Sequence, residues 1–197
     1  AKHVEQIEDA GALPEALTRA FRLACAGRPG PVVLALPSDV LEAEVAAAGV
    51  SPLPVHEQPP DPGLMERFHR VLGDARRPML LLGGSGWTDA ARADIQAFSE
   101  ANALPVCCGF RRIDLFDNSH PCYAGDLGIG ANPALVARLR QADLLVAIGS
   151  RLGEATSQGY TLLPVREQRG GEQPGGEPRG GPELVHVHTD PAEPGRV

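Results

Sequence analysis

Hydrophobic positions along the chain alternate between two spacings. After residue 60, Leu64, Phe68, Val71 and Leu72 recur every three to four residues, as on the buried face of a helix. Similar helical patterns follow around Ile95 and Leu139, and short apolar runs separate them, which indicates strands covered on both faces. The predicted strands are residues 79–82, 104–108, 144–148 and 184–188. This alternation predicts an α/β fold, a Rossmann-like doubly wound parallel sheet with helices on both faces.

The first 60 residues contain only one such unit and a proline-rich stretch. Leu13, Leu17, Phe21 and Ala24 predict a helix, and the apolar run 32–36 predicts a strand. A single helix and strand cannot form a stable sheet alone, so the start of the chain looks truncated. We therefore predict the C-terminal end of a preceding domain over 1–38, an interdomain linker over 39–60, and a central nucleotide-fold domain over 61–197.

Two stretches of the central domain lack a regular pattern. Residues 109–130 show no periodicity, and irregular segments of this length within a domain are more often functional than accidental. Residues 166–182 read REQRGGEQPGGEPRGGP, which offers nothing to bury and predicts a mobile surface insertion. A regulatory or partner-binding role of this insertion stays open beside that of a tolerated loop.

Charge and hydropathy exclude several classes of function. The chain has 18 Lys and Arg against 25 Asp and Glu, a net charge of -7, and no basic run, which argues against nucleic-acid binding. No apolar stretch reaches the roughly 20 residues needed to cross a bilayer, and the first residues do not resemble a signal peptide. We expect no membrane association and a cytoplasmic location.

Candidate metal ligands and nucleophiles are few. Cys107 and Cys108 are neighbours in a predicted strand and point to opposite faces, so they cannot readily share a metal, and buried filler is favoured over a redox role. His186 and His188 face the same way, but no third ligand is evident, so a hydrogen-bonded pair is expected instead. No Ser-His-Asp, HExxH or P-loop pattern occurs. The sequence therefore gives no support to nucleophilic hydrolysis, zinc proteolysis or P-loop phosphoryl transfer, and we predict no metal site.

Ligand-binding candidates follow the predicted strands, because ligands of open parallel sheets bind at the carboxyl ends of the strands. Glycine lets a phosphate or adenosine approach the backbone, and arginine donates charge-assisted hydrogen bonds. Tight turns and surface ion pairs are the competing interpretations; Arg111 and Arg112 could equally be solvated or pair with Asp114 and Asp117. The candidates are Gly83, Gly84, Ser85, Gly109, Arg111, Gly149, Ser150 and Arg151.

A family resemblance covers nearly the whole chain. The run AFRLACAGRPGPVVLALPSDV, residues 20–40, resembles the end of the pyrimidine-binding domain of thiamine-diphosphate-dependent enzymes in the acetolactate synthase and benzoylformate decarboxylase superfamily. RRPMLLLGGSG, ANALPV, HPCYAGDLGIGANP and ADLLVAIGSRL resemble the central domain of that family, and LVHVHTDPAEPGRV resembles its closing strand and turn.

The resemblance implies an inactive fragment of an active parent enzyme. In this family, thiamine diphosphate and magnesium are held by two other domains, through a glutamate and a GDG-to-Asn motif. Neither occurs here, and Asp126 of GDLGIG matches the central domain instead. The parent would be a lyase or transferase acting on 2-oxo acids. Its partners would be the missing domains of the same chain, and it would form a dimer or tetramer.

The resemblance also implies a place for a nucleotide. The central domain of this family binds FAD in acetolactate synthases, ADP or a related nucleotide in others, and nothing in some members. The matching positions are the turns at Gly83, Gly109 and Gly149, although FRRIDLFDN and RLGEATSQG depart from the usual loops. An autonomous FAD- or ADP-binding module and a purely structural, oligomerising domain are therefore the alternatives.

Overall fold

The computed structural model describes residues 1–46, 59–162 and 182–194. The chain divides into two compact units, Ala1–Pro59 and Pro60–Val197, each of which is described by itself. No helix within the described ranges is long and apolar enough to cross a membrane.

The first unit is a helix packed on a two-stranded parallel sheet. Strand β1 (His3–Gln6) pairs with β2 (Val32–Ala35), and the chain between them passes through the short 3-10 helix η1 (Ala10–Ala12) and helix α1 (Leu13–Cys25). The predicted helix and the predicted strand are present. Strand β1 was not predicted, because HVEQ contains a single aliphatic residue and gives no strand pattern.

The predicted linker over 39–60 begins within a short helix that the sequence did not predict. Residues Ser38–Glu42 form helix α2, in which Asp39 occupies the first turn and Val40 is buried against Ile7 and Ala16. The alanine- and proline-rich sequence concealed this one-turn helix, whose apolar residue only finds its partners in the folded unit. Residues 47–58 of the predicted linker lie outside the described residues.

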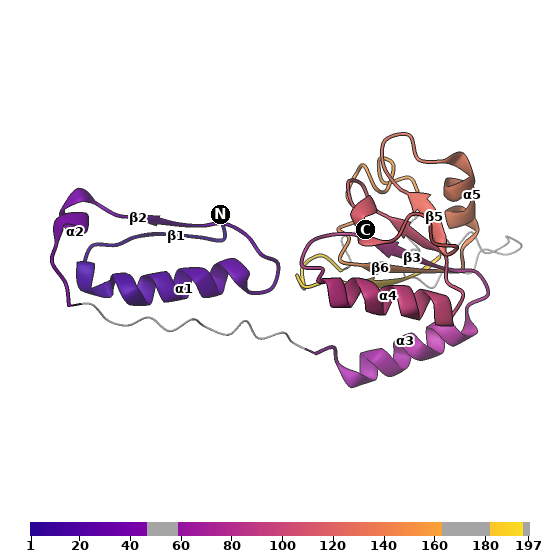
Figure 1. Cartoon of the computed structure of the whole chain (residues 1–197), viewed down its shortest axis with the longest axis horizontal. Coiled ribbons are helices and arrows are strands. Elements are labelled where there is room, and N and C mark those ends of the chain that lie inside the picture. The colour runs from indigo at the N-terminus through magenta and orange to yellow at the C-terminus, as the bar shows by residue number, and fades with distance from the viewer. Residues whose placement is uncertain (47–58, 163–181, 195–197) are drawn as a thin grey trace, which may run out of the picture. The chain divides into compact units, whose positions relative to one another are not determined.

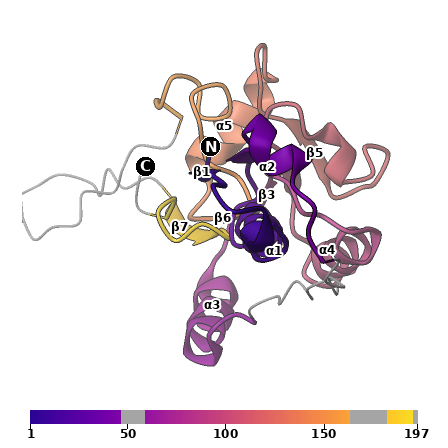
Figure 2. The same cartoon turned by 90° about the vertical axis from the view of Figure 1, so that its left-hand side faces the viewer.

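The second unit contains a sheet of five parallel strands in the order β5-β4-β3-β6-β7. Their bounds are Pro78–Leu82 for β3, Val106–Cys108 for β4, Tyr123–Asp126 for β5, Leu144–Ile148 for β6 and Glu183–Val187 for β7. Viewed in Figure 2, β7 lies at one end of this row and β5 toward the other. The chain runs outward from β3 to β5 and then returns to β6 on the other side of β3. The order therefore reverses between β3 and β6, as in a doubly wound sheet.

Three helices cover the two faces of this sheet, as predicted (Figure 1). Helices α3 (Pro62–Asp74) and α4 (Asp89–Ala101) pack on one face through side chains that include Phe68, Ile95 and Phe98. Helix α5 (Pro133–Gln141) packs on the other face through Leu135 and Leu139. Each helix starts at a side-chain cap, and the caps are Asp61, Thr88 and Asn132.

The stretch without periodicity, 109–130, contains two elements that the sequence did not predict. A 3-10 helix, η2 (Ile113–Leu115), is followed by strand β5, which pairs with β4 through a register shift. The sequence of β5, YAGD, has no apolar run, so only its neighbour identifies it as a strand. Of the predicted insertion 166–182, all but Pro182 lies outside the described residues.

Candidate functional site

The predicted glycine turns meet at one edge of the five-stranded sheet. Gly83, Gly109 and Gly149 each directly follow a strand, and each donates its N–H to a carbonyl at the end of the strand beside it in the sheet. Gly83 donates to Ile148 at 2.9 Å, Gly109 to Leu82 at 2.8 Å and Gly149 to Val187 at 2.8 Å. The three segments chosen from the sequence are thus neighbours at the carboxyl edge, around the reversal of strand order.

Backbone contact between two of these turns accounts for their glycines. Gly84 and Gly149 both have a φ of +70°, in the left-handed region that favours glycine. A Cβ on Gly84 would lie 2.0 Å from the carbonyl oxygen of Gly149, and one on Gly149 would lie 2.6 Å from that of Gly83. The space that glycine leaves here is taken by the facing backbone. These contacts favour the tight-turn interpretation over a ligand contact.

Trp87, the only tryptophan of the chain, lies against the same pair of turns. Its indole Nε1 donates to the carbonyl oxygen of Gly83 at 2.8 Å, and a Cβ on Gly149 would approach the same nitrogen to 3.6 Å. Ser85, in the turn between them, is exposed. Trp87 was not singled out from the sequence, although a lone tryptophan directly after GGSG was a signal that could have found it.

Ser150 and His186 connect the ends of β6 and β7. The Oγ of buried Ser150 accepts from the N–H of Leu152 at 3.2 Å, and its carbonyl oxygen lies 2.7 Å from His186 Nε2. Since a carbonyl only accepts, Nε2 carries the hydrogen, and Nδ1 of His186 is a buried acceptor without a partner among the described residues.

His188, the second histidine of the pair, accepts from the N–H of Asp190 through Nδ1 at 3.0 Å. Its ring lies edge-on to that of His186, with 5.8 Å between the ring centres. Across the described ranges, no group of three or more His, Cys, Asp or Glu side chains could hold a metal ion.

Arg151 is paired within the chain. Its Nε donates to Oε1 of Glu193 at 2.8 Å, across 42 residues of sequence. The Glu193 side chain is 3% exposed and that of Arg151 47%, so a buried carboxylate meets a half-exposed guanidinium. Glu193 was missed from the sequence, where nothing links the closing turn to the end of β6.

The two arginines after Gly109 have different surroundings. Arg112 forms a bidentate pair with Asp114, with Nε and Nη2 at 3.0 and 3.1 Å from the two carboxylate oxygens. Arg111 is exposed, has a φ of +60°, and places its guanidinium 5.0 Å from the ring centre of Phe110. Thr156 fixes this turn from the other side, because its Oγ1 accepts from the N–H of Phe110 at 3.1 Å.

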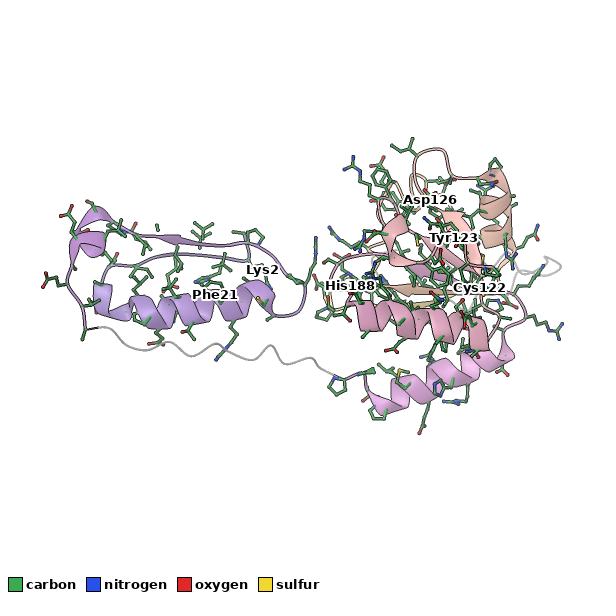
Figure 3. The ribbon with its side chains drawn as sticks, in the orientation of Figure 1. Lys2, Phe21, Cys122, Tyr123, Asp126 and His188 are labelled. Atoms are coloured by element: carbon green, nitrogen blue, oxygen red, sulfur yellow. The ribbon has the colours of Figure 1, made fainter. Side chains whose placement is uncertain are left out.

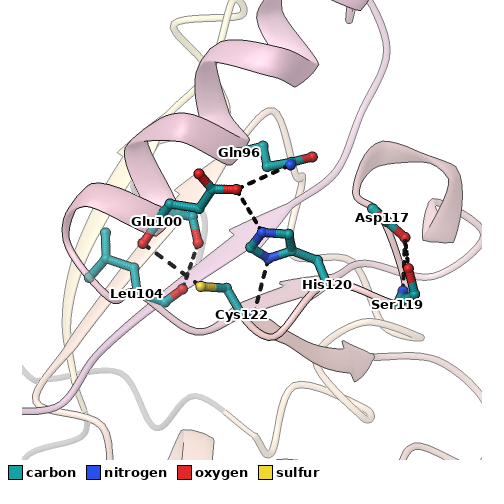
Figure 4. A network of polar contacts seen from close by, with 8 residues as sticks. Gln96, Glu100, Leu104, Asp117, Ser119, His120 and Cys122 are labelled. Carbon is teal, nitrogen blue, oxygen red and sulfur yellow. Dashed lines mark hydrogen bonds and ion pairs between the residues drawn. The ribbon is translucent and has the colours of Figure 1, made fainter.

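A separate polar network ties helix α4 to the segment before β5 (Figure 4). His120 Nε2 lies 2.7 Å from Glu100 Oε1, and His120 Nδ1 accepts from the N–H of Cys122 at 3.1 Å. The pKa of Glu100 is lowered, mainly by its hydrogen bond with His120. Both ring nitrogens of His120 are engaged in these contacts. We interpret the network as a structural tie.

Cys107 and Cys108 fit the role of buried filler, whereas Cys25 is exposed. Cys107 and Cys108 point to opposite faces of the sheet, as predicted, and both are fully buried. Burial, followed by the charges of Asp114 and Asp126, raises the pKa of Cys108 to about 12, so its thiol stays protonated at neutral pH. Tyr123 and Asp126 lie in β5 and Cys122 directly precedes it (Figure 3), and in the sheet order β4 separates β5 from β3.

Comparison with known proteins agrees with this geometry. Residues 65–197 match the family model "Thiamine pyrophosphate enzyme, central domain". The chain belongs to this family. The central domain, as we call its second unit from here on, therefore has a Rossmann-like fold shared with thiamine pyrophosphate (thiamine diphosphate) enzymes, as the sequence predicted.

The similar proteins are much longer than this chain. An acetolactate synthase large subunit from Corynebacterium glutamicum is 29% identical over 100% of the chain, and an isozyme 2 large subunit from Escherichia coli is 27% identical over 98%. The crystal structure of benzoylformate decarboxylase from Polynucleobacter necessarius superposes with a TM-score of 0.74 at 26% identity over 98% of the chain. The chain spans 30%, 32% and 34% of these three proteins.

Proposed function

We propose that this chain is part of a thiamine-diphosphate-dependent lyase or transferase that acts on 2-oxo acids, and that its central domain has a mainly structural role. The observation that carries the proposal is the family match over residues 65–197, together with relatives that align over residues on both sides of residue 60. Among the described residues, no group of three or more His, Cys, Asp or Glu side chains could hold a metal ion. The reaction itself is assigned to residues outside this chain.

Residues 1–38, extended by helix α2, are proposed to be the end of a pyrimidine-binding domain. Parallel sheets are stable when both faces are covered, but β1 and β2 are covered on one face only. Val4 and Val33 are 66% and 47% exposed, and Phe21 of α1 is 69% exposed. We propose that further strands and helices of the same protein cover these side chains.

The coding sequence on both sides of the 197 residues tests whether the chain is part of such an enzyme. We expect a glutamate-containing pyrimidine-binding segment upstream and a GDG-to-Asn motif downstream. The protein made from the complete coding sequence should convert a 2-oxo acid such as pyruvate, only in the presence of both thiamine diphosphate and Mg²⁺. A complete coding sequence without these two motifs would contradict the proposal.

Calorimetry on the 197-residue chain tests whether thiamine diphosphate is bound by other domains of the parent protein. We expect no saturable heat when thiamine diphosphate and Mg²⁺ are titrated into the 197-residue protein, because the described residues contain no acidic cluster for the metal. Tight, Mg²⁺-dependent binding would show that the cofactor site had been assigned to the wrong domains.

Binding of FAD or ADP at the carboxyl edge is the second candidate function. The reversal of strand order between β3 and β6 favours this place, since nucleotides bind at such points in doubly wound sheets. The occupied space at Gly84 and Gly149 and the pairing of Arg151 count against it. A yellow purified protein, or a melting temperature that rises with FAD or ADP, would support this candidate.

The assembly and location of the parent are also part of the proposal. We propose a dimer or tetramer in the cytoplasm, without nucleic-acid or membrane partners. Sedimentation of the complete protein and fractionation of cells that express it are the measurements that test these points.

A further inference from the structure

Glu193 is a charged side chain that the sequence analysis did not use and that the fold holds in a fixed place. It belongs to the turn after β7, where the N–H of Asp190 donates to His188 Nδ1 and the N–H of Ala192 donates to Asp190 Oδ1. The N–H of Glu193 itself donates to the carbonyl oxygen of Asp190 at 3.1 Å. These bonds fix the backbone from which the carboxylate projects.

The burial of this carboxylate requires a partner of opposite charge. Glu193 is 3% exposed, and an ionised carboxylate so removed from water is costly unless a cation or donors compensate it. Arg151 supplies the cation, with Nε 2.8 Å from Oε1. Because β6 and β7 are adjacent and parallel, the residues after both strands meet at the same edge, which places the pair there.

Arg151 is also the arginine that would bind a phosphate at this edge. It follows Gly149 and Ser150 directly, beside the reversal of strand order. A phosphate competes with Glu193 for the same guanidinium and is repelled by the carboxylate, since like charges at close range disfavour each other. We propose that Glu193 is a built-in counter-anion of Arg151 that closes this edge to phosphate-bearing ligands.

The surroundings of Arg151 agree with a closed edge. The Gly83–Gly84 turn is in contact with the Gly149–Ser150 turn, and Trp87 donates to Gly83. Backbone groups that could have cradled a phosphate are thus packed against each other. The inference concerns the place where the second candidate function would bind, and it does not depend on the role of thiamine diphosphate in the parent.

The decisive experiment removes the negative charge of Glu193 and measures whether the protein then binds anions. Pyrophosphate and ADP are titrated by calorimetry into the 197-residue protein and into E193Q, R151Q and the double variant E193Q/R151Q. E193Q keeps an oxygen that can accept from Arg151 Nε and loses the charge. R140Q removes a different exposed arginine, from helix α5, and is the matched control.

We expect E193Q to bind pyrophosphate at least about tenfold more tightly than the unaltered protein, the size of one charge-assisted hydrogen bond. The double variant should lose this gain and R140Q should not acquire it. A folded E193Q that binds no better than the unaltered protein would overturn the proposal.

R151Q keeps the proposal testable if E193Q does not fold. If Arg151 is already paired with Glu193, its loss should not change anion binding, and R151Q and the unaltered protein should bind pyrophosphate and ADP equally weakly. Saturable binding to the unaltered protein that R151Q abolishes and R140Q preserves would show that Arg151 is open to ligands, and the proposal would be wrong. The thiamine diphosphate requirement of the complete protein is unaffected by either result.

Discussion

At the scale of single residues, the glycines of the carboxyl edge show how one residue type can serve two purposes. A glycine-rich turn after a strand is compatible with an approaching phosphate and with an approaching backbone. At Gly84 and Gly149 the approaching group is backbone of the same chain, at distances where a Cβ could not fit. The residue type was predictable from its place, but the partner was not.

Substitution of Gly84 should separate crowding from backbone strain. G84A combines a left-handed φ with a contact to the Gly149 carbonyl, and we expect a loss of roughly 3 kcal/mol or more in the free energy of unfolding. G86A is the matched control, because Gly86 has a φ of +88° but nothing within 4 Å of its Cβ position. It should lose only about 1–2 kcal/mol. Urea denaturation measures both, and equal losses would contradict the crowding argument.

At the scale of elements, local signals and long-range contacts fix different features. The starts of α3, α4 and α5 are set by neighbouring residues, since each cap accepts from an N–H two or three positions later. The relative position of elements depends on residues such as Asp143. Its two carboxylate oxygens accept from the N–H groups of Arg76 and Arg77 at 2.7 and 2.8 Å, and its own carbonyl accepts from Glu183.

The cap of α4 provides a local prediction. Thr88 Oγ1 accepts from the N–H of Ala91 at 3.1 Å, so T88A should lower the free energy of unfolding by about 1 kcal/mol, the usual value for a lost cap. T88S keeps the hydroxyl and should stay within about 0.5 kcal/mol of the unaltered protein. Thermal or urea unfolding followed by circular dichroism distinguishes the two variants, and the helix start is misassigned if they behave alike.

Asp143 provides a pH-dependent prediction. Burial raises the pKa of Asp143, but the N–H groups of Arg76 and Arg77 outweigh it and hold the pKa below the ordinary 3.8. A carboxyl whose pKa is lower in the folded state stabilises the fold above its unfolded pKa and loses this effect as pH falls through the folded pKa. D143N should therefore cost about 1–2 kcal/mol at neutral pH, toward the lower end because the side chain is exposed.

The same difference should shrink when the pH falls below about 4, where the unaltered carboxyl begins to take up its proton. Urea unfolding over a range of pH measures the difference between D143N and the unaltered protein. D94N, which changes an exposed aspartate of α4, should show little effect at any pH. A D143N difference that is constant with pH would show that the ionised carboxylate is not the stabilising form.

At the scale of the whole molecule, the two units differ in how well their sheets are covered. The central domain has helices on both faces and a continuous buried core on each side of its strands. The first unit buries Ile7, Ala16 and Val40 under one face of a two-stranded sheet. Small sheets of this kind are marginally stable by themselves, so the two units should differ in how cooperatively they unfold.

Separate expression of the two units tests this difference. Residues 59–197 should unfold in one cooperative thermal transition, whereas residues 1–59 should show no sharp transition, because the exposed Val4, Val33 and Phe21 have no cover. Circular dichroism and calorimetry measure both. A cooperative melt of residues 1–59 as a monomer would contradict the proposal that the unit is the end of a larger domain.

The sequence by itself determined the fold class, helices α1, α3, α4 and α5, the apolar strands β2, β3, β4, β6 and β7, and the edge at which candidate residues gather. It did so because the spacing of apolar residues is a local property. Only the tertiary structure revealed strands β1 and β5 and helix α2, whose short or polar sequences become regular against their neighbours. It alone joined Glu193 to Arg151 and Glu100 to His120, because side-chain pairing across 42 or 20 residues leaves no periodic trace in a sequence.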